Sequence, residues 1–167
     1  MGTTIADSLR EATSLLREAG VPEARREAGS LLSYVIGRDR TFLISHAEDP
    51  VDEQNQVHFR EAVARRAAGE PLQYITGVQD FFGREFRVTT DTLIPRPETE
   101  LLVEAALEVI AEGASICDVG TGSGCIAVTL LCERTDALAV AIDISEAALA
   151  VAAENAQRHG VSDRMVF

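Results

Sequence analysis

The order of apolar and polar positions divides the chain into a helical first part and a mixed second part. In the first part, apolar residues recur at helical spacing in four successive runs, and short polar or glycine-containing segments separate them. The runs lie at residues 4–19, 22–36, 41–47 and 52–68, and the last should face the core with Val57, Ala62, Val63 and Ala67. Short connections between helices of this length predict a small helical bundle over residues 1–69.

The stretch from Leu72 to Val88 has a different pattern, because its apolar and polar residues alternate loosely and it contains half of the aromatic side chains. Glycines at 77 and 83 interrupt the alternation, which predicts two short strands with a turn near residues 82–85. We interpret residues 70–92 as a β-hairpin linker, in which Phe81 and Phe82 pack rather than stack on a ligand.

A segment with two prolines follows, Pro95-Arg96-Pro97-Glu98, and an apolar helical run comes after it. Pro97 suits the first turn of a helix, where its missing N–H costs nothing. A second proline is more than a helix start needs, so we interpret the segment as a stiff support for Arg96. The residues expected to face inward from the helix are Leu101, Leu102, Ala105, Ala106, Val109 and Ile110.

From residue 114 the pattern alternates between strands and helices. Strands are predicted at 115–119 and 138–142, helices at 125–133 and 146–159, and the last residues open a third strand. This order is typical of an α/β fold with a parallel sheet. Because such sheets usually contain ~5–6 strands, we interpret residues 93–167 as an incomplete domain that belongs to a longer protein or needs a partner.

The loop between the first strand and its helix carries the candidate chemistry. Asp118 ends the strand, and glycines follow at alternate positions, with the sequence Gly120, Thr121, Gly122, Ser123 and Gly124. Glycine tolerates positive φ and lets a ligand approach the backbone. A dinucleotide site would have the spacing G-x-G-x-x-G and a pyrophosphate on the helix N-terminus, whereas an acid just before the glycines suits a cationic ligand.

A second acid, Asp143, ends the next strand, where a carboxylate can accept hydrogen bonds from both ribose hydroxyls. A ribose with a nearby positive charge and no phosphate describes S-adenosylmethionine. The alternatives are a nicotinamide or flavin cofactor and a βα turn with chance glycines.

Charge and composition restrict the classes of molecule that the chain is expected to bind. The net charge is −12, all fifteen basic residues are arginine, and residues 71–167 hold 6 arginines against 15 acids. Such a chain should not hold nucleic acid through bulk electrostatics. No apolar run is long enough for a membrane span and no signal peptide is recognisable, which predicts a cytoplasmic protein. The histidines form no metal-ligand pattern, and Cys117, Cys125 and Cys132 are expected to be small buried residues.

Two sets of motifs resemble a known family. The runs DVGTGSG and AIDIS look like the cofactor motifs of class I methyltransferases, and GEPLQYITGVQDFFGREFRVTTDTLIPRPETELLVEAAL is more specific. It resembles the PrmC/HemK family, the peptide chain release factor N5-glutamine methyltransferases. The resemblance implies a Rossmann-like domain that binds S-adenosylmethionine through the glycine loop and Asp143, with Asp118 beside the methionine end. It also implies a release factor as protein substrate, for which we expect the helical domain over residues 1–69 to be the docking surface, and places Arg96, Pro97 and Glu98 at the border of the active-site pocket.

One family motif is missing. The Asn-Pro-Pro-Tyr sequence, which in this family grips the substrate glutamine amide, does not occur, and the catalytic residues are therefore unknown. We predict that the parent protein is an enzyme and that these 167 residues alone are inactive. Three alternatives remain open: a ribosomal-protein glutamine methyltransferase, a nucleic-acid N-methyltransferase, and a non-catalytic module that binds a partner through its helical bundle and hairpin.

Overall fold

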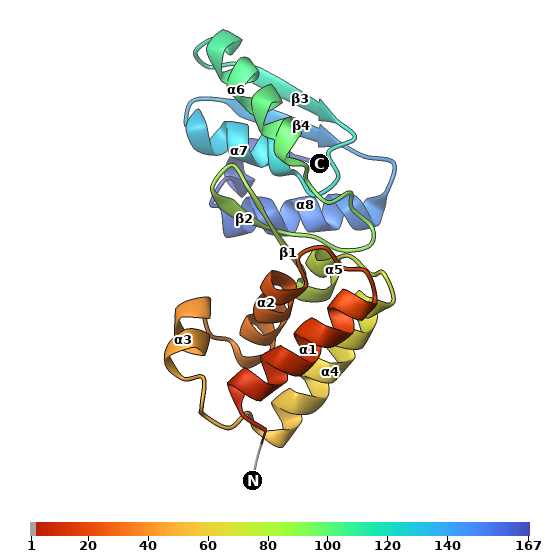
Figure 1. The fold of residues 1–167 in the computed structure, drawn as a ribbon. Helices are drawn as coiled ribbons and strands as arrows, with labels where there is room; N and C mark the ends of the chain where they lie inside the picture. The colour runs from red at the N-terminus through yellow and green to blue at the C-terminus, as the bar shows by residue number, and fades with distance from the viewer. Residues whose placement is uncertain (1–2) are drawn as a thin grey trace. The chain divides into compact units, whose positions relative to one another are not determined.

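The computed structural model describes residues 3–167, which fall into two compact units (Figure 1). The first unit ends at Thr76 and the second begins at Gly77. Each unit has its own core of buried side chains. The finer division expected from the sequence, with a separate linker over residues 70–92, stays a prediction.

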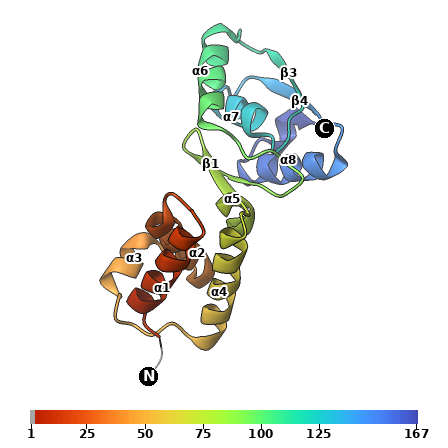
Figure 2. The ribbon, with the colours of Figure 1, turned by 45° about the vertical axis from the view of Figure 1, so that its right-hand side comes forward.

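The first unit is helical, and α1, α2 and α4 pack against one another (Figure 2). Its helices are α1 (Ile5–Glu18), α2 (Ala24–Ile36), α3 (Arg40–Ser45), α4 (Glu53–Ala67) and α5 (Leu72–Thr76). Thr4, Asp39 and Asp52 cap α1, α3 and α4, because each side chain accepts a hydrogen bond from a backbone N–H of the first turn. The helical bundle predicted from the sequence is confirmed.

Two details of this unit differ from the prediction. Val57 was expected in the core but is 47% exposed, and Phe59 occupies the buried face of α4 instead. Two residues correspond to about 200° around a helix, so both side chains cannot face the same core. The residues of α5 were expected to form part of a strand, but they form one helical turn that buries Ile75.

The second unit begins with a hairpin of β1 (Val78–Phe81) and β2 (Arg84–Arg87). Phe82 and Gly83 form a two-residue turn and both have positive φ, as a type I′ turn requires. The Glu100 carboxylate accepts the Phe82 N–H at 2.8 Å and supports this unusual backbone. Phe81 and Phe86 are fully buried, with their rings edge to face at 6.1 Å, so the aromatic residues pack as predicted.

A parallel three-stranded sheet follows, in the order β3 (Ser115–Val119), β4 (Leu138–Ile142) and β5 (Met165–Val166). Helix α7 (Cys125–Glu133) connects β3 to β4, and α8 (Glu146–Arg158) leads from β4 towards β5. Short 3₁₀ turns at Pro97–Thr99 and Ser162–Arg164 precede α6 (Glu100–Val109) and β5. The predicted α/β order, the start of a Rossmann-like sheet, is confirmed.

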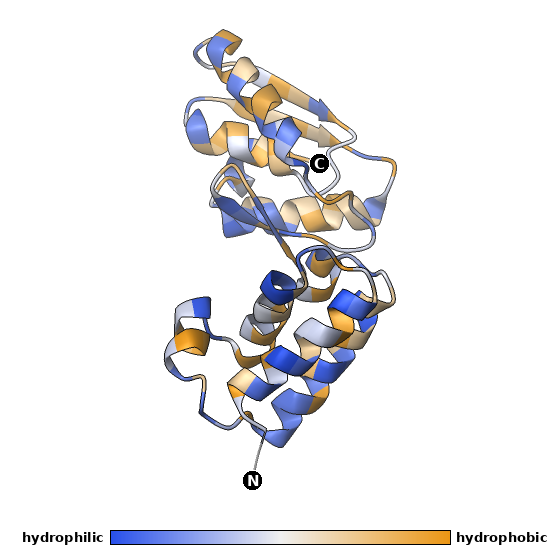
Figure 3. Cartoon of the chain, viewed as in Figure 1, coloured by the Kyte–Doolittle hydropathy of each residue, from blue (hydrophilic) through white to orange (hydrophobic). Residues whose placement is uncertain are grey.

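The two faces of this sheet have different surroundings. Crossovers of one hand between neighbouring strands bring α7 and α8 to the same face, and Ala139, Ala141 and Met165 are buried there in the core. The opposite face, which we call the open face, carries large apolar side chains that are exposed. Figure 3 shows the apolar residues of β3 and β4 in orange. The open face consists of Ser115, Cys117, Val119, Leu138, Val140, Ile142 and Val166.

The predicted inward face of α6 is right for Ala106 and Ile110 and wrong for the other large side chains. Leu101, Leu102 and Val109 are 66%, 55% and 80% exposed, whereas Val103 is fully buried. The residues that pack on the core with Val103 are Ala106, Leu107 and Ile110. These positions also have helical spacing, so α6 has two apolar faces, and periodicity alone does not distinguish between them.

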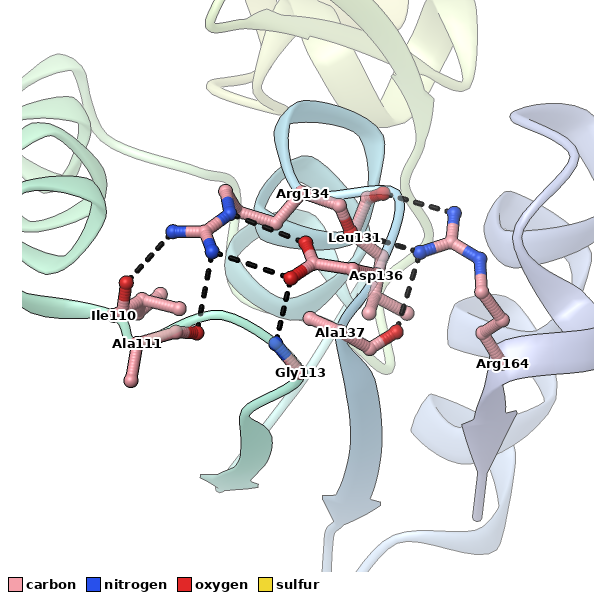
Figure 4. Close-up of polar contacts among 8 residues, drawn as sticks. All are labelled: Ile110, Ala111, Gly113, Leu131, Arg134, Asp136, Ala137 and Arg164. Carbon is pink, nitrogen blue, oxygen red and sulfur yellow. Dashed lines mark hydrogen bonds and ion pairs between the residues drawn. The ribbon is translucent and has the colours of Figure 1, made fainter.

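Two arginines hold the loops that lead into β3 and β4 (Figure 4). Arg134 donates to the carbonyls of Ile110 and Ala111 at 2.7 and 3.2 Å, and Asp136 accepts the Gly113 N–H at 2.6 Å. That N–H, and after it Arg134, keeps the pKa of Asp136 below its ordinary value. Arg164 donates to the carbonyls of Leu131 and Arg134. This network lies at the amino ends of the strands and leaves their carboxyl ends free for a site.

None of the helices in residues 3–167 is both long enough and apolar enough to cross a membrane.

Candidate functional site

The glycine loop lies at the carboxyl end of β3, where ligands of open α/β sheets usually bind. Gly120, Gly122 and Gly124 have φ of 80°, 55° and 78°, a conformation that residues with side chains rarely adopt. A Cβ on Gly120 or Gly122 would meet open space, so the backbone is accessible there. A Cβ on Gly124 would lie 3.1 Å from that of Ala152, which means that Gly124 lets α8 pack tightly against the loop.

Asp118 is the last residue but one of β3, beside this loop, and is half-buried. The buried Thr121 hydroxyl donates to Asp118 Oδ2 at 2.8 Å. No arginine forms an ion pair with Asp118 among the described residues, and Oδ1 has no hydrogen bond there. The carboxylate therefore has one oxygen available to a ligand next to the loop.

Asp143 joins the glycine loop to the loop after β4. Its two carboxylate oxygens accept the Gly122 and Ser145 N–H groups at 2.9 and 3.0 Å. The Ser145 bond, followed by the Gly122 bond, lowers the pKa of Asp143 below its ordinary value. The Ile142 carbonyl also accepts the Gly120 and Thr121 N–H groups at 2.7 and 3.0 Å. The structure thus brings the predicted residues of both loops together into one site.

Asn155 on α8 supports this site, and the sequence pattern did not identify it. Its side chain is fully buried, and its amide nitrogen donates to the carbonyls of Ser123 at 2.8 Å and Arg87 at 2.9 Å. Its oxygen accepts the Arg87 N–H at 2.8 Å. Asn155 therefore connects the glycine loop, the hairpin and α8. The signal in the sequence is an amide at position 155 within the inward helical spacing of Ala148, Val151 and Ala152.

The cysteines give no sign of nucleophilic chemistry. Burial raises the pKa of Cys125 to about 11, which keeps its thiol protonated. Cys132 is half-buried, as a small packing residue would be, but Cys117 is exposed. The prediction that all three are buried is wrong for Cys117, because it lies on the open face of the sheet.

The predicted site residues of the proline-containing segment have no polar contact with the glycine loop within residues 3–167. Pro95 is buried, while Arg96, Pro97 and Glu98 are exposed. Arg96 uses its carbonyl to accept the Thr99 N–H at 3.0 Å and so begins the 3₁₀ turn. No hydrogen bond or ion pair within residues 3–167 joins these side chains to the glycine loop. Their position at a pocket border stays a prediction.

Comparison with known proteins supports the two-part organisation. Residues 7–77 match the family model of the PrmC N-terminal domain, and residues 110–167 match a methyltransferase domain. A release factor glutamine methyltransferase of Nitratidesulfovibrio vulgaris is 48% identical over 165 residues, 98% of this chain and 56% of that protein. Relatives of the same name from Cereibacter sphaeroides and Burkholderia pseudomallei are 52% and 48% identical, over 96% and 93% of this chain and 57% and 54% of their own lengths.

The chain belongs to the release factor glutamine methyltransferase family. The match includes the hairpin and the glycine loop, since it extends over nearly all of the 167 residues. The chain spans little more than half the length of these relatives.

Proposed function

We propose that the whole protein transfers a methyl group from S-adenosylmethionine to a glutamine side-chain amide of a peptide chain release factor. The observation that carries this proposal is the pair of carboxylates, Asp118 and Asp143, on either side of an accessible glycine backbone. The names of the relatives supply the reaction and the substrate. Because release factors act in translation, the reaction would take place in the cytoplasm.

The donor groups of the site fit this cofactor. Each Asp143 oxygen accepts one backbone N–H and retains a second lone pair, so both can accept from neighbouring ribose hydroxyls. Asp118 offers a negative charge with one oxygen unengaged, which would attract a sulfonium. Gly120 and Gly122 allow the backbone to approach the ligand closely. A pyrophosphate would instead meet two carboxylates.

The residues of the chain would act by positioning and electrostatics. When bound, S-adenosylmethionine supplies an activated methyl group. Asp143 would fix the ribose, and Asp118, oriented by Thr121, would hold the cationic end next to the loop. An amide nitrogen is a weak nucleophile, so the rate would depend on holding it in line with the methyl. The family resemblance assigns that task to an Asn-Pro-Pro-Tyr motif outside this sequence, and we therefore predict no transfer by these residues alone.

Calorimetric titration tests the cofactor assignment. The chain should bind S-adenosylmethionine but not NADH, and Asp143→Asn should weaken binding by about tenfold, the effect of losing one hydrogen bond to a charged group. The control is Asp163→Asn, which removes an exposed carboxylate in the 3₁₀ turn before β5. NADH binding, or equal effects of the two variants, would contradict the assignment.

Methylation itself is tested with a whole protein of this family that carries the present sequence. With release factor and labelled S-adenosylmethionine, mass spectrometry should find one methyl group on a glutamine. Methylation of a nucleic acid, with an affinity that falls steeply as salt rises, would instead support the nucleic-acid alternative.

A further inference from the structure

The helical unit contains a cleft lined by arginines, which the cofactor site does not use. Its larger part has a volume of about 650 Å³ between α1, α2 and α3, and an adjoining part has about 390 Å³. Arg17, Arg25 and Arg40 line both parts, while Arg10 borders the first and Arg26 the second. We call these surfaces together the arginine cleft.

The charge of this cleft is opposite to that of the protein. Residues 1–70 contain 9 arginines and 12 acids, yet five of those arginines line the cleft and Glu23 is the one acid among its lining residues. Asp7 pairs with Arg10 at 3.0 Å, but Arg17, Arg25 and Arg40 form no ion pair within the described residues. Three guanidinium groups are thus available to an anionic ligand.

One buried glycine of α2 lies against an arginine of this cleft. Gly29 lies inside α2, where glycine costs about 1 kcal/mol relative to alanine. It is buried, and a Cβ there would already touch Arg40 Nε at 3.8 Å. A larger side chain would displace the guanidinium. Gly29 therefore lies against the Arg40 guanidinium, which lines the same cleft as Arg25.

The remaining lining identifies the kind of anion. Leu9, Leu43 and Ile44 form an aliphatic wall beside the arginines, and Ile44 is 78% exposed. No aromatic side chain lines either part of the cleft, so bases would find no stacking surface there. Carboxylates suit guanidinium groups through paired hydrogen bonds, and the aliphatic wall suits apolar side chains between them. This combination fits an acidic segment of a protein better than RNA.

We propose that the arginine cleft binds an acidic, aliphatic segment of a protein partner. That this partner is the release factor rests on the function proposed above. The helical unit would then recognise the protein substrate, while the glycine loop holds the cofactor.

Fluorescence anisotropy with the 167-residue chain tests the cleft directly. The probe is a short labelled peptide of alternating Glu and Leu, compared with a Lys and Leu peptide and with oligouridine of the same length. The Glu peptide should bind most tightly. Arg25→Glu should weaken it by at least about tenfold, and Arg25→Lys should weaken it less, because lysine keeps the charge but loses the paired hydrogen bonds. Arg60→Glu is the matched control, since Arg60 is exposed on α4 and lies outside the cleft.

The outcomes separate the cleft from the cofactor site. Equal weakening by Arg25→Glu and Arg60→Glu would overturn the proposal, and so would tighter binding of oligouridine. Circular dichroism checks that the variants fold, and Arg40→Gln repeats the test at a second position. Arg25→Glu should leave the affinity for S-adenosylmethionine unchanged, so a failure of the cofactor assignment is recognised separately. Purified release factor then replaces the peptide, and an unchanged affinity for Arg25→Glu would overturn its assignment as the partner.

Discussion

The two faces of the parallel sheet are built from the same strands but have opposite surroundings. Along β4, Ala139 and Ala141 are almost fully buried, whereas Leu138, Val140 and Ile142 are 54%, 44% and 46% exposed. The smaller side chains lie on the covered face, because α7 and α8 approach closely there. The larger side chains lie on the open face. Size and apolarity of a residue therefore do not indicate which side of this sheet is packed.

A continuous apolar strand is typical of a sheet that is covered on both faces. The relatives are considerably longer than this chain, which corresponds to 54–57% of three of them. We therefore expect the corresponding face of these longer relatives to be covered by a part of their chain that lies outside the matched residues. The following predictions compare the covered side with the open side in the 167-residue chain.

The largest difference in unfolding free energy should arise between a carboxylate placed on the covered face and one placed on the open face. Ala139→Asp puts a carboxylate into the core without a partner and should cost more than about 4 kcal/mol of unfolding free energy. Val140→Asp, at the next residue, should cost less than about 1 kcal/mol, because its side chain is in water. Urea unfolding followed by circular dichroism measures both. If Val140→Asp is as damaging as Ala139→Asp, the open face is covered in solution.

The next effect concerns the amide that connects α8 with the loop and the hairpin. Asn155→Ala leaves the buried Ser123 carbonyl and two part-buried backbone groups of Arg87 without their partner and should cost about 2–3 kcal/mol. It should also weaken S-adenosylmethionine binding, since Ser123 loses its support. Gln157→Ala, two residues away and exposed, should change stability by less than about 0.5 kcal/mol. An Asn155→Ala variant with normal stability and affinity would show that Asn155 does not position the loop.

Alanine substitutions at two glycines of the same loop should differ by a smaller amount in their effect on stability. Gly124→Ala adds a contact at 3.1 Å with Ala152 to the strain of positive φ, and should cost about 2 kcal/mol. Gly120→Ala carries the strain alone, because its side chain would enter open space, and should cost about 1 kcal/mol. Thermal unfolding of both variants gives the difference. Equal losses of stability would show that α8 moves away from the new methyl group at little cost.

The smallest effect is the pH dependence contributed by Asp143. Its pKa in the folded protein lies below the ordinary value of 3.8, so its stabilising contribution is complete above that pH. The contribution disappears as the pH falls through the folded pKa. The stability of the natural chain should therefore exceed that of Asp143→Asn at neutral pH, and the gap should narrow below pH 3.8. A gap that is constant with pH would mean that the two N–H bonds do not depend on the charge.

Much of the fold followed from local patterns. Helical spacing located α1, α2, α3 and α4, and the alternation around Gly83 located the hairpin. The order of strands and helices gave the parallel sheet. The glycines at 120, 122 and 124 and the acids at 118 and 143 also located the loops that the structure brings together. These features depend on backbone conformation and on residues close in sequence, which a single sequence records directly.

The sequence by itself therefore determined most of the helices and strands, with α5 as an exception, and which loop presents the glycines and acids. Only the tertiary structure decided which apolar face of α6 is buried, that the open face is uncovered, and that Asn155 holds the loop. The physical reason is that helical spacing is a local property. The choice between two apolar faces, and the partners of a buried amide, depend on segments far away in the sequence, as Asn155 and Arg87 illustrate.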